Sequence, residues 1–315
     1  MATIPVGAAS IPRVSRVARR SYRIVAEIPS IPLLILSILA FVAVFAPVLA
    51  PHPKFTPVKP TPEQCQARFG MASCPYVDNV PPFWARGGTF DTPLGTDFLG
   101  RDVLSRLMYG ARISLVVALT GTLFAGAIGT LLGVVAGYMG KWWDQIIMRI
   151  TDAWLTLPSL VFAILLSSVR GPGLWNVVLI LALVFWSRYS RAVRGEVLAL
   201  RERDFVKLAE INGIGKVKII RRHLIPNVMN TVMVLFSLQV GVAVIIEASL
   251  SFLGVGVPPP EPSWGLMMAQ ERDSLMEGKW WLAVFPGICV TMLVLCANML
   301  GDWLRVRLDP QLRNR

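Results

Sequence analysis

The sequence predicts an all-helical protein that crosses a membrane about six times. Hydrophobic residues make up 54% of the 315 residues, charged residues only 16%, and the mean hydropathy is +0.59. Soluble domains carry fewer apolar and more charged residues. Five or six apolar runs approach the length that a helix needs to cross the ~30 Å hydrocarbon core of a bilayer, so we expect one polytopic helical domain.

The predicted spans occupy most of the chain. The fourth is the shortest, and it continues directly into the polar stretch 187–191. Without it, five spans would place the two termini on opposite sides of the membrane, whereas six spans place them on the same side. The expected spans are 31–49, 113–137, 153–169, 174–186, 228–253 and 281–300.

Basic residues favour six spans and set their orientation. Four segments that would share one side hold 21 of the 31 Lys and Arg residues, namely 1–30, 138–152, 187–227 and 301–315. Because Lys and Arg gather in cytoplasmic segments, we expect the basic segment 1–30 and the tail 301–315 to be cytoplasmic. The first apolar run is longer than that of a usual signal peptide, which favours a retained first span.

The segment 50–112 is expected to form a long loop on the opposite, extracytoplasmic side. It is rich in proline and has no sustained hydrophobic period. Cys65 and Cys74 are nine residues apart in this loop and could form a disulfide in an oxidising compartment, with two free thiols as the alternative. The core domain of the protein is then 113–300, with the remaining five spans.

Several functional classes are excluded by what the sequence lacks. Basic residues flank the apolar runs and are not interleaved with aromatic residues on a soluble face, so the net charge of +12 does not indicate nucleic-acid binding. The only histidines are His52 and His223, and no cysteine-histidine cluster has the spacing of a transition-metal site. No phosphate-binding loop is present, so we expect no ATP hydrolysis and no cofactor on this chain.

The basic segment 204–226 has the pattern of a docking element. It predicts a short helix over 204–212, a turn at Gly213, and a basic helix that ends at Pro226. Apolar anchors for the groove of a partner would be Leu208 and Ile211, with Val217, Ile220 and Leu224 in the second helix. Composition alone also allows an amphipathic loop that lies on anionic lipid.

Five further motifs occur in order along the chain. Together with Ala209, Gly213 and the run His223-Leu-Ile-Pro226, they resemble the C-type permease subunit of the ABC importers for dipeptides, oligopeptides or nickel. The resemblance covers nearly all of 93–313. The motifs are LGTDFLGRDVLSR at 94–106, MRITD at 148–152, EASLSFLG at 247–254, PSWG at 262–265 and GDWLR at 301–305, continued by LDPQLR at 308–313.

This resemblance implies the type I ABC importer permease fold in a bacterial-type inner membrane. It implies a homologous B-type permease, two ATPase subunits that carry ATP and Mg²⁺, and an extracytoplasmic binding protein as partners, besides membrane lipid. Di- or oligopeptides are the expected cargo by family frequency, with nickel or glutathione as alternatives. The implied ATPase-coupling residues are Lys207, Ala209, Gly213, His223, Leu224 and Pro226.

The sequence departs from the family pattern at three positions in this segment. Lys207 stands where glutamate is usual, Leu208 where alanine is common, and Ile225 where leucine usually precedes the proline. Coupling is still expected, because Ala209, Gly213 and the residues before the proline match. The charged partner of Lys207 on the ATPase is expected to differ accordingly.

Acidic residues in the spans offer a rival function. Glu247 is a candidate residue of the translocation path, or else an interhelical group, because an ionisable side chain at membrane depth is costly. Asp152 is expected to pair locally with Arg149 or to lie at an interface. A secondary transporter driven by an ion gradient would use both acids, but its inverted repeats and broken helices are not evident in the sequence.

Overall fold

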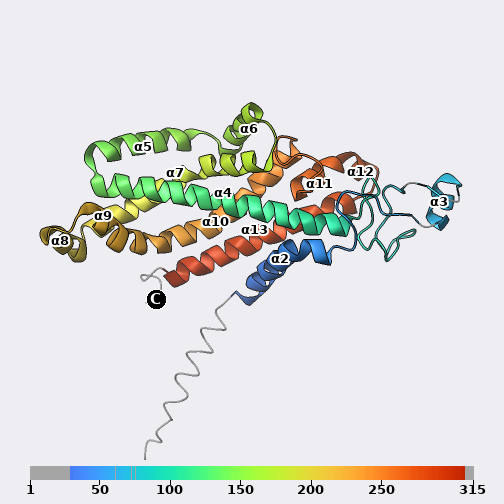
Figure 1. The fold of residues 1–315 in the computed structure, drawn as a ribbon, viewed down its shortest axis with the longest axis horizontal. Helices are drawn as coiled ribbons and strands as arrows, with labels where there is room; N and C mark the ends of the chain where they lie inside the picture. Colours follow the sequence, from blue (N-terminus) through green and yellow to red (C-terminus); the bar gives the residue numbers. More distant parts are fainter. Residues whose placement is uncertain (1–28, 61, 72, 75, 309–315) are drawn as a thin grey trace, which may run out of the picture.

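The computed structural model describes residues 29–60, 62–71, 73–74 and 76–308, which form a helical bundle. The basic N-terminal segment and the last residues of the tail lie outside the described residues. Figure 1 shows α4, α7, α10 and α13 lying lengthwise in the bundle, with α8 and α9 at one end and α3 and α12 at the other. The main helices are α2 (Ser30–Leu49), α4 (Val103–Met139), α5 (Lys141–Thr156), α6 (Ser159–Arg170), α7 (Leu174–Arg201), α10 (Ile225–Phe252) and α13 (Trp281–Leu308).

Short helices occupy the two ends of the bundle. One end carries α8 (Asp204–Ile211), α9 (Lys216–Ile219) and the π-helical turn η1 (Ile220–Leu224). The other carries α3 (Pro62–Phe69), α11 (Trp264–Gln270) and α12 (Arg272–Met276). The described residues thus place the long loop after α2 and the docking segment at opposite ends (Figure 1).

Among the described residues, five helices are long and apolar enough to cross a membrane, and a sixth span forms only if the bent pair α5 and α6 is counted as one. These two helices meet at an angle of 94°. The prediction of a continuous span over 153–169 is therefore wrong, because α5 ends before Pro158 and α6 begins after it. Leu157 has the extended backbone (φ −77°, ψ 130°) that a residue before proline prefers. The prediction that broken helices are absent is wrong for the same reason.

Three predicted boundaries also differ. Helix α4 begins at Val103, ten residues before the expected span, because the Asp102 carboxylate caps it by accepting from the Ser105 backbone N–H (2.8 Å). Helix α7 continues to Arg201, well beyond the expected end at 186. Its polar part stays helical because Ser187, Tyr189 and Ser190 are buried in the bundle. Helix α13 continues past 300 to Leu308.

Helices α4 and α7 pack against each other most extensively. Gly121, Gly129, Gly133 and Gly137 of α4 all face α7, and a Cβ atom built at each would lie 2.3–2.8 Å from atoms of α7. These four glycines therefore pack the two spans together. Gly126 packs less tightly against α7 than these four glycines, because a Cβ atom built on it would lie 3.4 Å from the Tyr189 ring. The glycines let the two helix backbones approach closely.

The extracytoplasmic loop of the prediction is ordered by buried charges. The Asp97 carboxylate accepts from Arg101 Nε (2.7 Å) and forms an ion pair with Arg106. Arg106 in turn donates to Gln270 Oε1 (2.9 Å) and so connects α4 to α11. Cys65 and Cys74 are joined in a disulfide, with Cα atoms 5.6 Å apart. The Asp97–Arg106 ion pair therefore holds the loop to α4, and the disulfide closes a small ring within the loop.

Candidate functional site

The docking segment predicted at 204–226 connects α7 to α10 at one end of the bundle (Figure 1). Helix α8 ends in a Schellman motif: the Gly213 N–H donates to the Glu210 carbonyl (3.0 Å) and the Ile214 N–H to the Ala209 carbonyl (3.1 Å). Gly213 has φ +70°, the left-handed conformation that this motif requires. The predicted turn at Gly213 is confirmed.

The prediction that Pro226 ends the second helix is wrong. Pro226 is the second residue of α10, and the π-helical turn before it accommodates a residue that has no backbone N–H to donate. Just before it, the Ile225 N–H donates to the Ile220 carbonyl, which is the five-residue spacing of a π-turn. The π-turn η1 therefore joins α9 to α10 without interruption, and the docking segment is continuous with a membrane-spanning helix.

One face of the segment is packed on the ends of the long helices. Val206 and Ala209 of α8, Ile219 of α9 and Leu224 of η1 are buried in an apolar cluster with valines of α4, α7 and α10. The Tyr138 hydroxyl of α4 also donates to Glu210 Oε1 of α8 (2.9 Å). This packing fixes α8 relative to the bundle, so a force on α8 is transmitted to α4, α7 and α10.

The opposite face combines exposed apolar and basic side chains. Leu208, Ile211 and Val217 are 57%, 80% and 70% exposed. Three cations close to them in the sequence are also exposed, namely Lys207, Lys216 and Lys218. Lys207 pairs with Glu202 at 3.0 Å, and the pair is solvent-exposed. We refer to Leu208, Ile211 and Val217 with these three cations as the docking face.

The six residues expected to couple to an ATPase fall into two groups. Lys207, Gly213 and Pro226 are exposed, and His223 is half-buried with its ring 6.1 Å from that of Phe205. Ala209 and Leu224 are buried within the subunit. The expectation that Leu224 anchors a partner is therefore wrong for this arrangement. Both residues position the docking face, because they pack on the side that points into the bundle.

The chain is similar to known transport proteins over most of its length. A family model described as the binding-protein-dependent transport system inner membrane component matches residues 129–314. The chain belongs to this family. It is a multi-pass inner-membrane permease subunit of an ABC importer, and the rival function of a secondary transporter is not favoured.

Curated relatives and a solved structure agree with this assignment. The permease is 38% identical to the di/tripeptide transport system permease protein DppC of Pseudomonas aeruginosa, over 87% of this chain and 85% of that one. It is 43% identical to a protein of Brucella suis named as a peptide permease, over 69% of this chain and 72% of that one. A chain of the inward-facing MetNI methionine ABC transporter shares the fold, with a TM-score of 0.53 at 14% identity, and covers 65% of this chain and 96% of its own.

Glu247 of the permease is placed inside the subunit. Its carboxylate is fully buried and accepts hydrogen bonds from Ser114 Oγ of α4 (2.8 Å) and Ser251 Oγ of α10 (2.9 Å). Ser251 Oγ also accepts from the Val257 backbone N–H (3.2 Å). Of the two roles predicted for Glu247, the geometry supports the interhelical one, because the side chain lines no exposed surface.

We expect Glu247→Gln to leave both the stability and the transport of the permease nearly unchanged, because the amide can still hydrogen-bond the two serines. Glu247→Ala should lower the free energy of unfolding by about 1–3 kcal/mol, since it leaves buried hydroxyls unpaired. Thermal unfolding in detergent measures the stability of both variants, and uptake into vesicles measures their transport. Loss of uptake in Glu247→Gln with unchanged stability would show a role for the carboxylate in transport.

Two other acidic side chains tie α5 to α7. Asp152 forms an ion pair with Arg191 of α7, so of the two predicted roles the local pair with Arg149 is wrong, and the geometry supports a position at an interface between helices. Asp144 accepts two hydrogen bonds from Arg194, at 2.5 and 2.7 Å. These pairs were not predicted, because the fourth span was expected to end at 186. Both arginines lie beyond that point, in the part of α7 that runs beside α5.

Proposed function

We propose that this permease forms half of a translocation pathway for di- or oligopeptides. ATP and Mg²⁺ would bind to two separate ATPase subunits, which dock on the docking face from the cytoplasm. A homologous B-type permease would form the other half of the pathway, and an extracytoplasmic binding protein would deliver the cargo. The names of the relatives support peptides as the cargo, with nickel or glutathione as the alternatives.

The observation that carries this proposal is the exposed apolar triad of the docking face. Leu208, Ile211 and Val217 project from a segment whose other side is firmly packed. Exposed apolar side chains within a basic surface fit a partner groove that is apolar inside and acidic at its rim. Because η1 continues into α10, movement of the docked ATPase would reach a membrane-spanning helix directly.

The orientation of the permease in the membrane is part of the same proposal. The described basic residues gather at the α8 end of the bundle, in α7, α9 and η1, which supports a cytoplasmic location for that end. The disulfide Cys65–Cys74 at the other end supports an oxidising, extracytoplasmic location for the long loop. Both termini would then be cytoplasmic, and transport would be directed inward.

We expect Leu208→Ser combined with Ile211→Ser to release the ATPase subunits without affecting membrane insertion. Burying one such side chain contributes about 1.5–3 kcal/mol, so losing two should weaken binding by more than about a hundredfold. The measurement is mild-detergent purification of the tagged permease, followed by quantification of the ATPase that stays bound. Val306→Ser, also an exposed apolar side chain but in α13, is the matched control.

Retention of normal ATPase levels by the double variant would contradict the assigned docking face. Loss of ATPase in Val306→Ser as well would indicate a general defect of the assembly. Cargo is tested separately, by uptake of a labelled dipeptide into vesicles that contain the permease with its partners. Competition by unlabelled peptides, and none by a nickel chelate or glutathione, would support peptide transport.

A further inference from the structure

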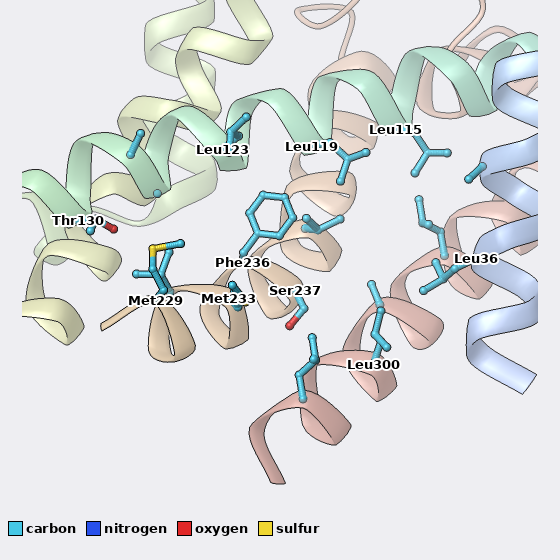
Figure 2. Close-up of a pocket in the computed structure, with 18 of the residues that line it drawn as sticks. Leu36, Leu115, Leu119, Leu123, Thr130, Met229, Met233, Phe236, Ser237 and Leu300 are labelled. Carbon is cyan, nitrogen blue, oxygen red and sulfur yellow. The ribbon is translucent and has the colours of Figure 1, made fainter. Parts of the chain in front are cut away.

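A large apolar groove runs between α2, α4, α10 and α13, and its lining includes neither the apolar residues of the docking face nor Glu247. Its volume is about 810 Å³, within the range of pockets that hold small molecules. Figure 2 shows Leu119 and Leu123 of α4, Met229 and Phe236 of α10 and Leu36 of α2 around one open space. The groove is thus a gap between four membrane-spanning helices.

The chemistry of the walls excludes polar cargo. None of the described residues that line the groove is charged, and almost all are leucine, methionine, valine, phenylalanine or alanine. The Ser237 hydroxyl already donates to the Val234 carbonyl (2.8 Å). A peptide here would leave its backbone groups without hydrogen-bond partners, at a cost of several kcal/mol. The groove therefore suits a hydrocarbon chain.

The length of the groove also matches a lipid tail. On α10 its lining extends from Ile225 to Val240, which is about 22 Å at 1.5 Å per residue. One leaflet of the hydrocarbon core is about 15 Å thick. With the α8 end of the bundle at the cytoplasmic surface, as proposed above, the groove begins near that surface at the first residue of α10 and extends past the middle of the bilayer.

Basic residues lie at the end of the groove that is near the membrane surface. Ile225 lines that end, and the exposed Arg221 and Arg222 precede it by about one turn. On α13, Leu304 lines the groove and the exposed Arg305 follows it. Asp302 is the acidic residue in the same turn of α13, so the basic side chains outnumber it. This charge fits a phosphate group at the membrane surface.

We propose that the groove binds one acyl chain of an anionic phospholipid, whose phosphate lies near Arg221, Arg222 and Arg305. The leaflet follows from the orientation proposed above, and it is the inner one. The bound lipid fills the gap between α2 and α10 and contacts the helix that carries η1. The lipid site is separate from the path of the cargo, because its walls are mostly apolar and carry no charge.

The experiment uses the permease in its native assembly, purified in mild detergent and titrated with phosphatidylglycerol or phosphatidylcholine. Native mass spectrometry counts the lipids that stay bound. Ala127→Trp fills part of the groove and should weaken lipid retention by more than about tenfold. This is the loss expected when two methylene groups of the acyl chain are no longer buried in the groove. Ile128→Trp is the matched control, because its side chain is exposed at the same depth of α4 outside the groove.

Charge is tested with two double variants of equal net charge. Arg221→Gln with Arg222→Gln should remove most of the preference for phosphatidylglycerol, because each basic residue near the surface contributes about fivefold. Lys216→Gln with Lys218→Gln should retain it. Equal retention of both lipids by the unmodified protein, or unchanged retention in Ala127→Trp, would overturn the proposal.

A photo-reactive benzoylphenylalanine at Met233 identifies the occupant directly, even if Ala127→Trp folds poorly. Met233 lines the groove and is half-exposed (Figure 2). A covalent adduct with the mass of a phospholipid supports the proposal. An adduct with another polypeptide, such as a helix of the partner permease, would show that the groove is a protein interface and would overturn it.

Discussion

Replacement of Gly129 by alanine is expected to destabilise the permease strongly, although it adds a single methyl group. A Cβ atom at this position would lie 2.3 Å from the Trp186 carbonyl oxygen and 3.0 Å from the Ser190 backbone nitrogen. Both are backbone atoms of α7 and cannot rotate away. Relief therefore requires α4 and α7 to separate, which should cost at least about 1–3 kcal/mol and lower the thermal unfolding temperature.

Gly126→Ala is the matched control for this prediction. Its Cβ atom would lie 3.4 Å from the Tyr189 ring, a distance that a small shift of the ring can accommodate. Alanine also forms helices better than glycine by about 1 kcal/mol, so this variant should be neutral or slightly stabilising in the same detergent assay. Similar unfolding temperatures for the two variants would show that α4 and α7 do not depend on close contact at Gly129.

The sequence was sufficient to predict the number and the approximate positions of the spans, because apolar runs of this length have few other uses. It was not sufficient where tertiary contacts decide the helix ends. Ser187, Tyr189 and Ser190 were interpreted as the exit from the membrane, yet they continue α7, because α4 covers them through its glycines. A polar stretch was therefore mistaken for a loop.

The bend between α5 and α6 shows a second limit. Pro158 predicts a break, but an angle of 94° depends on what each helix packs against. The Trp154 indole Nε1 donates to the Leu183 carbonyl of α7 (2.6 Å), and the Ser167 hydroxyl donates to the Val255 carbonyl beyond α10. These contacts attach α5 to α7 and α6 to the segment after α10, and no local sequence pattern predicts them.

The docking segment shows the same difference between what local sequence signals predict and what tertiary packing decides. Its helices and its glycine turn could be predicted from local signals, namely a basic amphipathic pattern ended by Gly213. The side of each helix that faces the bundle could not be predicted from local signals. Leu224 was therefore expected to contact a partner, although it is fully buried. Its neighbour Pro226 was misplaced because proline both ends helices and begins them.

Substitution of Gly213 by a β-branched residue is expected to remove most of the ATP-driven uptake while membrane insertion stays normal. An added Cβ atom would meet no other atom of the subunit within 4 Å, so the effect inside the permease is conformational only. At φ +70° a residue with a Cβ atom is strained by about 1–2 kcal/mol, and a β-branched one by more. Relief of this strain would open the Schellman motif and change the angle at which α8 presents Leu208 and Ile211.

A graded series separates this mechanism from a clash with the ATPase. Asparagine tolerates the left-handed conformation, so Gly213→Asn should retain most of the uptake, Gly213→Ala less, and Gly213→Val less than about a tenth. Gly215→Ala is the control, because Gly215 lies in the same turn at φ −60° with equally open space around its Cβ position. Asparagine and valine have similar volumes, so equal losses in these two variants would show that the partner excludes the side chain and that the backbone conformation is not the cause.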